Sequence, residues 1–365
     1  MRGGGEYIIL ARKVISQIGK THMPHRTFFT FIFPSILAMV LFITLPIISV
    51  LVQSTYIEHP QVLVEVENCD PFACTKATRV DTDAMAILKK EQPLGRFAGL
   101  ASYTNRNHLA FSEIAEIVRT ASGTADIADQ VLNLPFYKAL SFTLTYCLFV
   151  TPAAMILGFS IALAVNTLSK RVKGPVIFVS ILPMIITPLI GSLIVSWMFN
   201  SQGILGASLQ ALFNDPKLSL RASPTLTWIV LLAYGVWTNG PFSFVVFYAG
   251  LQTVPADTLE SARIDGASRW EAVRFVIIPH LAPLATFVAL VQLMDNFRVF
   301  EPIVGFNAEA NATSLSWLVY NDLVSQDAQQ FGSAAATSVM TIIGVLILLT
   351  PLLVVTWRDF KQKAA

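Results

Sequence analysis

The chain has 365 residues, of which 54% are hydrophobic and only 13% are charged, and its formal net charge is +2. Soluble domains carry about 25% charged residues, so this composition argues against a soluble protein and predicts an integral membrane protein. A net charge this small gives no indication of nucleic-acid binding. The three cysteines include no CxxC pair, which argues against a zinc or redox motif.

Six apolar stretches are long enough to cross a membrane as helices, which takes about 20 residues each. Several contain proline, which a membrane bundle tolerates because neighbouring helices satisfy the freed backbone groups. The predicted fold class is therefore an all-α integral membrane protein with about six transmembrane helices and an extracytoplasmic insert after the first. The stretches are residues 28–52, 140–168, 174–199, 225–251, 280–304 and 332–357.

Lysine and arginine collect in the N-terminal segment, in the loops after the second and fourth stretches, and in the C-terminal tail. Short cytoplasmic loops carry such an excess, so both termini are expected in the cytoplasm. The resulting organisation is a cytoplasmic segment at 1–27, a first transmembrane helix at 28–54, an insert at 55–135, a core at 136–357 with a loop at 253–279, and a cytoplasmic tail at 358–365.

The insert shows local signals of structure. Apolar residues alternate over residues 62–66, which predicts a strand, and residues 112–121 predict a helix. Cys69 and Cys74 enclose four residues. They could form a disulfide if this side of the membrane is oxidising, or they could remain free thiols on a loop.

A polar elbow separates the fourth and fifth apolar stretches. Asp257 with Glu260 fits a capping box at a helix start, and Ser268 with Glu271 repeats the pattern. Gly266 lies between them and fits the left-handed residue that ends a helix. Such a loop could merely join two spans. Most connections are only a few residues long, however, so two helix starts favour a docking element for a partner.

The elbow resembles the E-A-A loop of ATP-binding-cassette importer permeases. Glu260-Ser261-Ala262 is followed by Gly266 and then by Ile277-Ile278-Pro279, and Ser261 replaces the usual second alanine. Other stretches are similar to the maltose-type carbohydrate permeases, and the chain is identified as a member of that family over about residues 95 to 360. These stretches are residues 97–103, 136–145, 182–183, 197–199, 237–242, 249–255 and 331–335.

The resemblance implies a type I importer permease fold and a position in the bacterial cytoplasmic membrane. It also implies a second permease subunit, two ATPase subunits, an external solute-binding protein and a carbohydrate or related polyol or glycoside as substrate. The chain has no GxxxxGK[ST] motif, so no cofactor and no catalytic residue are expected in it, and ATP and Mg would be bound by the ATPase. The residues expected to couple to the ATPase are Asp257, Glu260, Ser261, Ala262, Asp265, Gly266, Ala267 and Trp270.

Polar side chains inside apolar spans are costly, so they are candidates for the substrate pathway. Asp295 and Arg298 are three residues apart on one expected helix and could instead pair with each other. The candidates are Trp237, Asn239, Ser243 and Tyr248 in the fourth span, and Gln292, Asp295, Asn296 and Arg298 in the fifth.

Two other classes of function remain as alternatives. A secondary transporter acting without an ATPase would leave the elbow without a role. A membrane enzyme would need clustered ionisable groups, but the five histidines are scattered and form no HExxH pair, so no metal site is predicted.

Overall fold

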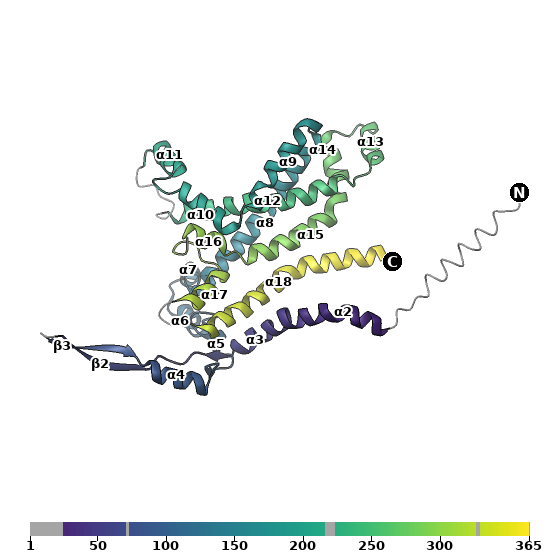
Figure 1. The fold of residues 1–365 in the computed structure, drawn as a ribbon. Helices are drawn as coiled ribbons and strands as arrows, with labels where there is room; N and C mark the ends of the chain where they lie inside the picture. The colour runs from purple at the N-terminus through teal and green to yellow at the C-terminus, as the bar shows by residue number, and fades with distance from the viewer. Residues whose placement is uncertain (1–24, 71–72, 216–222, 326–328, 365) are drawn as a thin grey trace. The chain divides into compact units, whose positions relative to one another are not determined.

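The computed structural model describes residues 25–70, 73–215, 223–325 and 329–364 (Figure 1). The chain divides into two compact units, residues 1–52 and 53–365. The cytoplasmic segment expected at 1–27 lies almost wholly outside the described residues.

The described part of the first unit is helical and makes up nearly all of an apolar stretch of 26 residues, Phe28–Gln53, which is long enough to cross a membrane. A π turn interrupts it and ends two residues before Pro46, whose missing N–H weakens the helical hydrogen-bond ladder there. Its segments are α2 (His25–Met39), η1 (Val40–Thr44) and α3 (Leu45–Gln53).

The insert is a mixture of short strands and helices. β2 (Leu63–Asp70) pairs with β3 (Ala73–Val80) as an antiparallel hairpin, so the strand expected at 62–66 is confirmed. The register sets Cys69 opposite Cys74, and the side chains of both lie outside the described part of the structure. The remaining elements are β1 (Tyr56–Ile57), which pairs with β4 (Arg96–Phe97), α4 (Thr82–Glu91), α5 (Ala101–Thr104), α6 (Phe111–Thr120) and α7 (Thr124–Leu132).

The rest of the second unit is helical, and three long helices, α8, α12 and α15, pack on one another. The elements are α8 (Pro135–Thr167), α9 (Lys170–Ile185), α10 (Pro188–Met198), α11 (Ile204–Phe213), α12 (Pro224–Leu251), α13 (Ala256–Ile264), α14 (Arg269–Ala272), η2 (Val273–Ile277), α15 (Ile278–Phe297), α16 (Glu301–Phe306), α17 (Leu315–Val324) and α18 (Phe331–Ala364).

Two of the expected spans differ from the structure. The third, at 174–199, is not one continuous helix, because α9 and α10 meet at a bend of 95°. Thr187 precedes Pro188, and a residue before proline is pushed out of the helical region. The fifth, expected at 280–304, ends at Phe297, and α16 follows as a separate helix. Five helices are therefore long and apolar enough to span a membrane among the described residues, or six if the bent pair counts as one span.

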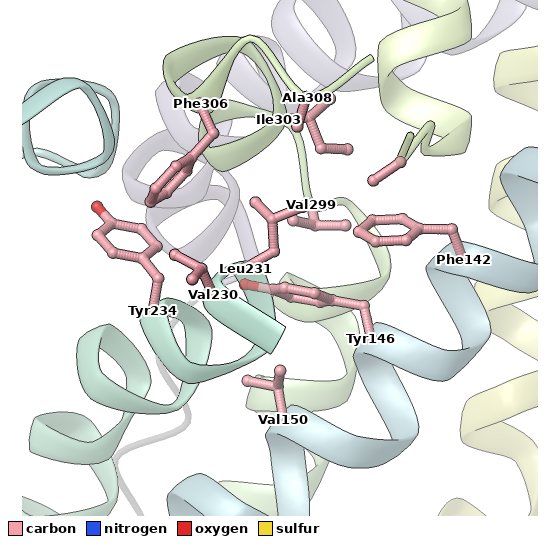
Figure 2. Close-up of a cluster of buried hydrophobic side chains, with 11 residues drawn as sticks. Phe142, Tyr146, Val150, Val230, Leu231, Tyr234, Val299, Ile303, Phe306 and Ala308 are labelled. Carbon is pink, nitrogen blue, oxygen red and sulfur yellow. The ribbon is translucent and has the colours of Figure 1, made fainter. Parts of the chain in front are cut away.

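Figure 2 shows one of the buried clusters where α8, α12 and α16 meet. Phe142, Tyr146 and Val150 extend from α8 toward Leu231 and Tyr234 of α12. The α8–α12 crossing is close because a glycine, Gly158, lies there: a Cβ at this position would be only 2.5 Å from the backbone nitrogen of Phe244. Small residues permit such close approach of helices in a membrane.

Candidate functional site: a cavity at a helix bend and an exposed elbow

A cavity of about 500 Å³ opens where the α9–α10 bend faces α8, α12 and the end of α15. Ligand sites commonly have volumes of about 300–1,000 Å³ and combine apolar walls with a few polar groups. The wall is made of Tyr146, Pro183, Met184, Ile186, Pro188, Tyr234, Thr238, Asn239, Asp295, Asn296, Arg298, Val299, Glu301 and Pro302.

Two buried tyrosines, Tyr146 and Tyr234, form part of the wall and also belong to the cluster in Figure 2. The hydroxyl of Tyr234 donates to the carbonyl oxygen of Pro188 at 2.7 Å. Pro188 is the first residue of α10, so this hydrogen bond ties the start of α10, next to the bend, to α12. The tyrosine therefore fixes the bend in place and gives the cavity an aromatic surface.

Two carboxamides on adjacent helices are held rigidly at the same cavity. The Nδ2 of Asn296 donates to the Oγ1 of Thr151 at 2.9 Å, and the Nδ2 of Asn239 donates to the carbonyl of Gly235 at 2.9 Å. Each amide thus has one fixed hydrogen bond inside the bundle. A carboxamide has further donor and acceptor capacity for a hydroxylated ligand.

Three acidic or basic residues lie in the cavity wall. Arg298 and Asp295 form an ion pair, with Nη2 and Oδ1 2.8 Å apart, as their spacing of three residues allowed. Glu301 begins α16 and has no ion-pair partner in the described part of the chain. The described residues include no group of three or more His, Cys, Asp or Glu side chains that could hold a metal ion.

The cavity brings together half of the residues expected in the substrate pathway: Asn239, Asp295, Asn296 and Arg298. The other four do not line it. Ser243 and Gln292 are buried in a hydrogen bond between α12 and α15. Trp237 packs its ring 6.0 Å from that of Tyr234, and Tyr248 lies beneath Lys173, whose Nζ is 5.5 Å from the ring centroid.

Sequence reasoning missed Tyr146, Tyr234 and Glu301. The tyrosines gave no signal, since aromatic residues in apolar helices are usually packing residues. Glu301 did give one: it lay inside the span expected at 280–304, and a carboxylate at membrane depth is a candidate functional residue.

The elbow consists of the helix α13, a turn at Gly266 and the helix α14. α13 ends in a Schellman motif: the Ala267 N–H donates to the Ala262 carbonyl at 3.0 Å and the Gly266 N–H to the Arg263 carbonyl at 3.1 Å. Gly266 has a φ of +84°, as expected. No heavy atom lies within 4 Å of a Cβ built there, so the turn needs glycine for its backbone angles and not for space.

Of the two expected capping boxes, one is confirmed. The side chain of Ser268 accepts from the Glu271 N–H, and Glu271 accepts from the Ser268 N–H at 2.7 Å. The box expected from Asp257 and Glu260 is wrong. The preceding Pro255, with a φ of −61°, is the N-cap, so the helix has already begun before Asp257 and its carboxylate lies in the first turn.

The elbow exposes apolar side chains. α13 buries none of its residues, and the exposed fractions are 86% for Ile264 and 67% for each of Trp270 and Phe275. From α14 the helix continues through the π turn η2 into α15, so Arg269–Phe297 is one apolar stretch of 29 residues. The elbow and the cavity residues Asp295 and Asn296 therefore lie at opposite ends of one helical rod (Figure 1).

The bundle of membrane-length helices, its polar cavity and its exposed elbow define a multi-pass membrane transport protein. Residues 152–359 match the family described as the binding-protein-dependent transport system inner membrane component. Because this match covers more than half of the chain, the chain belongs to that family, and the resemblance identified from the elbow is confirmed.

Two similar proteins are sugar permeases by name. The multiple sugar-binding transport system permease protein MsmF of Streptococcus mutans is 28% identical over 220 residues, which cover 59% of this chain and 74% of that protein. The trehalose/maltose transport system permease protein MalF of Thermococcus litoralis is 28% identical over 217 residues, covering 58% and 71%.

A solved structure shares the fold. It is a bacterial ABC transporter involved in the import of the acidic polysaccharide alginate, and its matching chain superposes with a TM-score of 0.62 at 18% identity, covering 95% of this chain and 99% of that one. The type I importer permease fold is confirmed, with two small two-stranded sheets, β1–β4 and β2–β3, in its insert. These matches do not support the alternative of a secondary transporter.

Proposed function

We propose that this chain is the membrane-spanning permease subunit of an ATP-driven importer, and that its cavity passes a carbohydrate or a related polyol or glycoside. The observation that carries the proposal is the continuous rod from the elbow to the cavity. At about 1.5 Å per residue, the 26 residues between Trp270 and Asn296 span about 39 Å. A displacement of the elbow therefore moves the cavity wall.

The partner at the elbow would be an ATPase subunit. Ile264, Trp270 and Phe275 are large apolar side chains beside the charged groups of α13 and α14, and exposed apolar patches rimmed by polar groups mark interaction surfaces. ATP and Mg would be bound and hydrolysed by that partner, with no cofactor in this chain. A complete importer would contain two ATPase subunits and a second permease.

The elbow and the C-terminus would face the cytoplasm of a bacterial cell. Lys170, Arg171 and Lys173 begin α9, Arg269 begins α14, and the C-terminal end of α18 carries further basic residues. The excess of lysine and arginine in short cytoplasmic loops supports this orientation. The insert would then lie outside, where an extracytoplasmic solute-binding protein delivers the substrate.

Sugar recognition is supported by the chemistry of the cavity and by the names of the relatives. Sugars offer many hydroxyl groups, which the carboxamides of Asn239 and Asn296 can bind as donors or acceptors. The rings of Tyr146 and Tyr234 supply the apolar wall that such sites usually have.

Reconstitution of the full importer in vesicles tests both ends of the rod. Trp270→Ala should lower substrate-stimulated ATP hydrolysis, while Trp357→Ala, an equally large truncation of an exposed tryptophan on α18, should not. Asn296→Ala should lower uptake with the ATPase still bound. If the Trp270→Ala complex keeps its ATPase and its full stimulated hydrolysis, the docking role of the elbow is wrong.

A further inference from the structure

The charges of the cavity do not balance. Asp295 and Arg298 neutralise each other through their 2.8 Å ion pair. Glu301 is the third acidic or basic residue in the wall. One uncompensated negative charge therefore remains in the cavity at neutral pH.

The position of Glu301 is fixed by the backbone of α16. Ser192 of α10 donates from Oγ to the Glu301 carbonyl at 3.3 Å. Gly305, one turn further on, lies so close to Ser192 that a Cβ there would overlap its side chain, so α16 is held against α10. Glu301 lines the same cavity as Tyr146 and Tyr234, so its charge lies in the wall that these two rings help to form.

A charge in this setting affects charged ligands far more than neutral ones. The energy between two unit charges scales inversely with distance and with the local dielectric, and apolar walls lower that dielectric. Glu301 is exposed and has no ion-pair partner among the described residues. An anionic group entering the cavity would meet repulsion from Glu301, and Arg298 offers little compensation because Asp295 already engages it.

We infer that Glu301 makes this cavity a filter for the sign of charge, which passes neutral or cationic glycosides and rejects anionic ones such as uronates and sugar phosphates. The inference rests on the proposed function and narrows its substrate class. Because Glu301 is exposed, a dielectric close to that of water applies, and the Coulomb energy at about 4 Å then corresponds to a selectivity of up to about tenfold for a single charge.

The test uses three versions of one sugar that differ only in charge. A panel of neutral glycosides first identifies a sugar that the reconstituted importer takes up. That sugar is then compared with its 6-amino-6-deoxy derivative and with its 6-carboxylate. Because the solute-binding protein also selects, its Kd for each of the three is measured separately, and each uptake kcat/KM is divided by the corresponding binding affinity.

Glu301→Gln should raise the corrected uptake of the carboxylate relative to the neutral sugar by about tenfold, and should lower that of the amine. Glu301→Asp keeps the charge and should keep the wild-type ratios. Glu309→Gln removes the same charge from a residue outside the cavity wall and serves as the matched control.

Two failures can be told apart. If the wild-type importer takes up neutral glycosides but Glu301→Gln leaves the three ratios unchanged, the charge filter is wrong and the proposed function stands. If the wild-type importer shows no ATP-dependent uptake of any neutral glycoside, the proposed function itself is overturned.

Discussion

Gln292 of α15 donates from Nε2 to the Oγ of Ser243 on α12 at 2.8 Å, and both side chains are buried. The same nitrogen donates to the carbonyl of Asn239 at 2.9 Å. The Oε1 of Gln292 has no hydrogen-bond partner among the described residues. Gln292 therefore ties the helix that leads from the elbow to the helix that carries Asn239, one turn away from the cavity residue Asn296.

Ser243→Ala should destabilise the bundle by about 0.6 kcal/mol, and by no more than about 1.7, the range found for hydrogen bonds between membrane helices. The change leaves a buried donor of Gln292 with one partner fewer. Ser160→Ala is the control, because the Ser160 hydroxyl is exposed and donates only to Ile156 of its own helix. Thermal unfolding in detergent measures both variants. Equal effects of the two would show that the Gln292 bond contributes nothing.

Gly158 should not tolerate even alanine. Its Cβ would lie 2.5 Å from the Phe244 nitrogen and 2.8 Å from the Gly240 carbonyl oxygen, so α8 and α12 must separate. Overpacking of this kind costs about 1–3 kcal/mol. Gly174→Ala in α9 meets no heavy atom within 4 Å and should be neutral or slightly stabilising, since alanine is the better helix former. The prediction fails if Gly158→Ala unfolds at the wild-type temperature.

A buried histidine should make stability depend on pH. His108 is fully buried, and its ring nitrogens face Asn105 Oδ1 at 2.8 Å and Thr337 Oγ1 at 3.0 Å. Burial lowers the pKa of His108 below 6.5. Its stabilising contribution is therefore complete above about pH 6.5, the pKa in the unfolded chain, and is lost as the pH falls through the lower pKa of the folded state.

The neighbouring Asp322, which accepts from the Ser333 hydroxyl at 2.7 Å, acts in the opposite direction. Burial raises the pKa of Asp322 above 3.8, so its contribution is greatest at low pH and is lost as the pH rises through that raised value. The free energy of unfolding should thus fall as the pH drops below about 6.5, the pKa of histidine in the unfolded chain, while protonation of Asp322 at lower pH offsets part of this loss.

Unfolding temperatures across this pH range in His108→Asn test the assignment. The variant should lose the pH dependence that wild type shows, whereas His59→Asn, at a histidine outside this network, should keep it. An unchanged slope in His108→Asn would assign the pH dependence to another group.

Local signals explain what the sequence could predict. The Gly266 turn and the Ser268–Glu271 box depend only on residues within one helical turn, so their pattern is readable directly. The box expected at Asp257 failed because Pro255, just before it, starts the helix earlier. The bend at Pro188 also has a local signal, the proline itself, and could have been predicted. The apolar run around it favoured a single span instead.

Long-range packing explains what could not be predicted. The cavity needs Tyr146, Tyr234 and Glu301 from three different helices, and no spacing along the chain brings them together. Conversely, Gln292 and Asn296 are four residues apart on one helical face, yet only Asn296 lines the cavity. The side chain of Gln292 is instead held by its hydrogen bond to Ser243 on α12. Which polar residue lines a cavity and which joins two helices is decided by the neighbouring helix.

The two cysteines of the insert, Cys69 and Cys74, should form a disulfide when the insert faces an oxidising compartment. Cys69 and Cys74 are register partners in the antiparallel β2–β3 hairpin. Directly opposite residues have Cβ atoms about 4.5–5.5 Å apart, closest in non-hydrogen-bonded pairs, which is near the separation of about 3.5–4.5 Å that a disulfide needs. Intact protein should then be lighter by the mass of two thiol hydrogens, and thiol alkylation should label both residues only after reduction.

Cys147 serves as the control, because it is buried beside the Leu293 carbonyl and should resist the reagent in the folded protein whether or not the disulfide forms. Labelling of Cys69 and Cys74 without reductant, in protein whose insert faces an oxidising compartment, would instead show that both are free thiols. In that case Cys69→Ala would leave the stability of the hairpin unchanged.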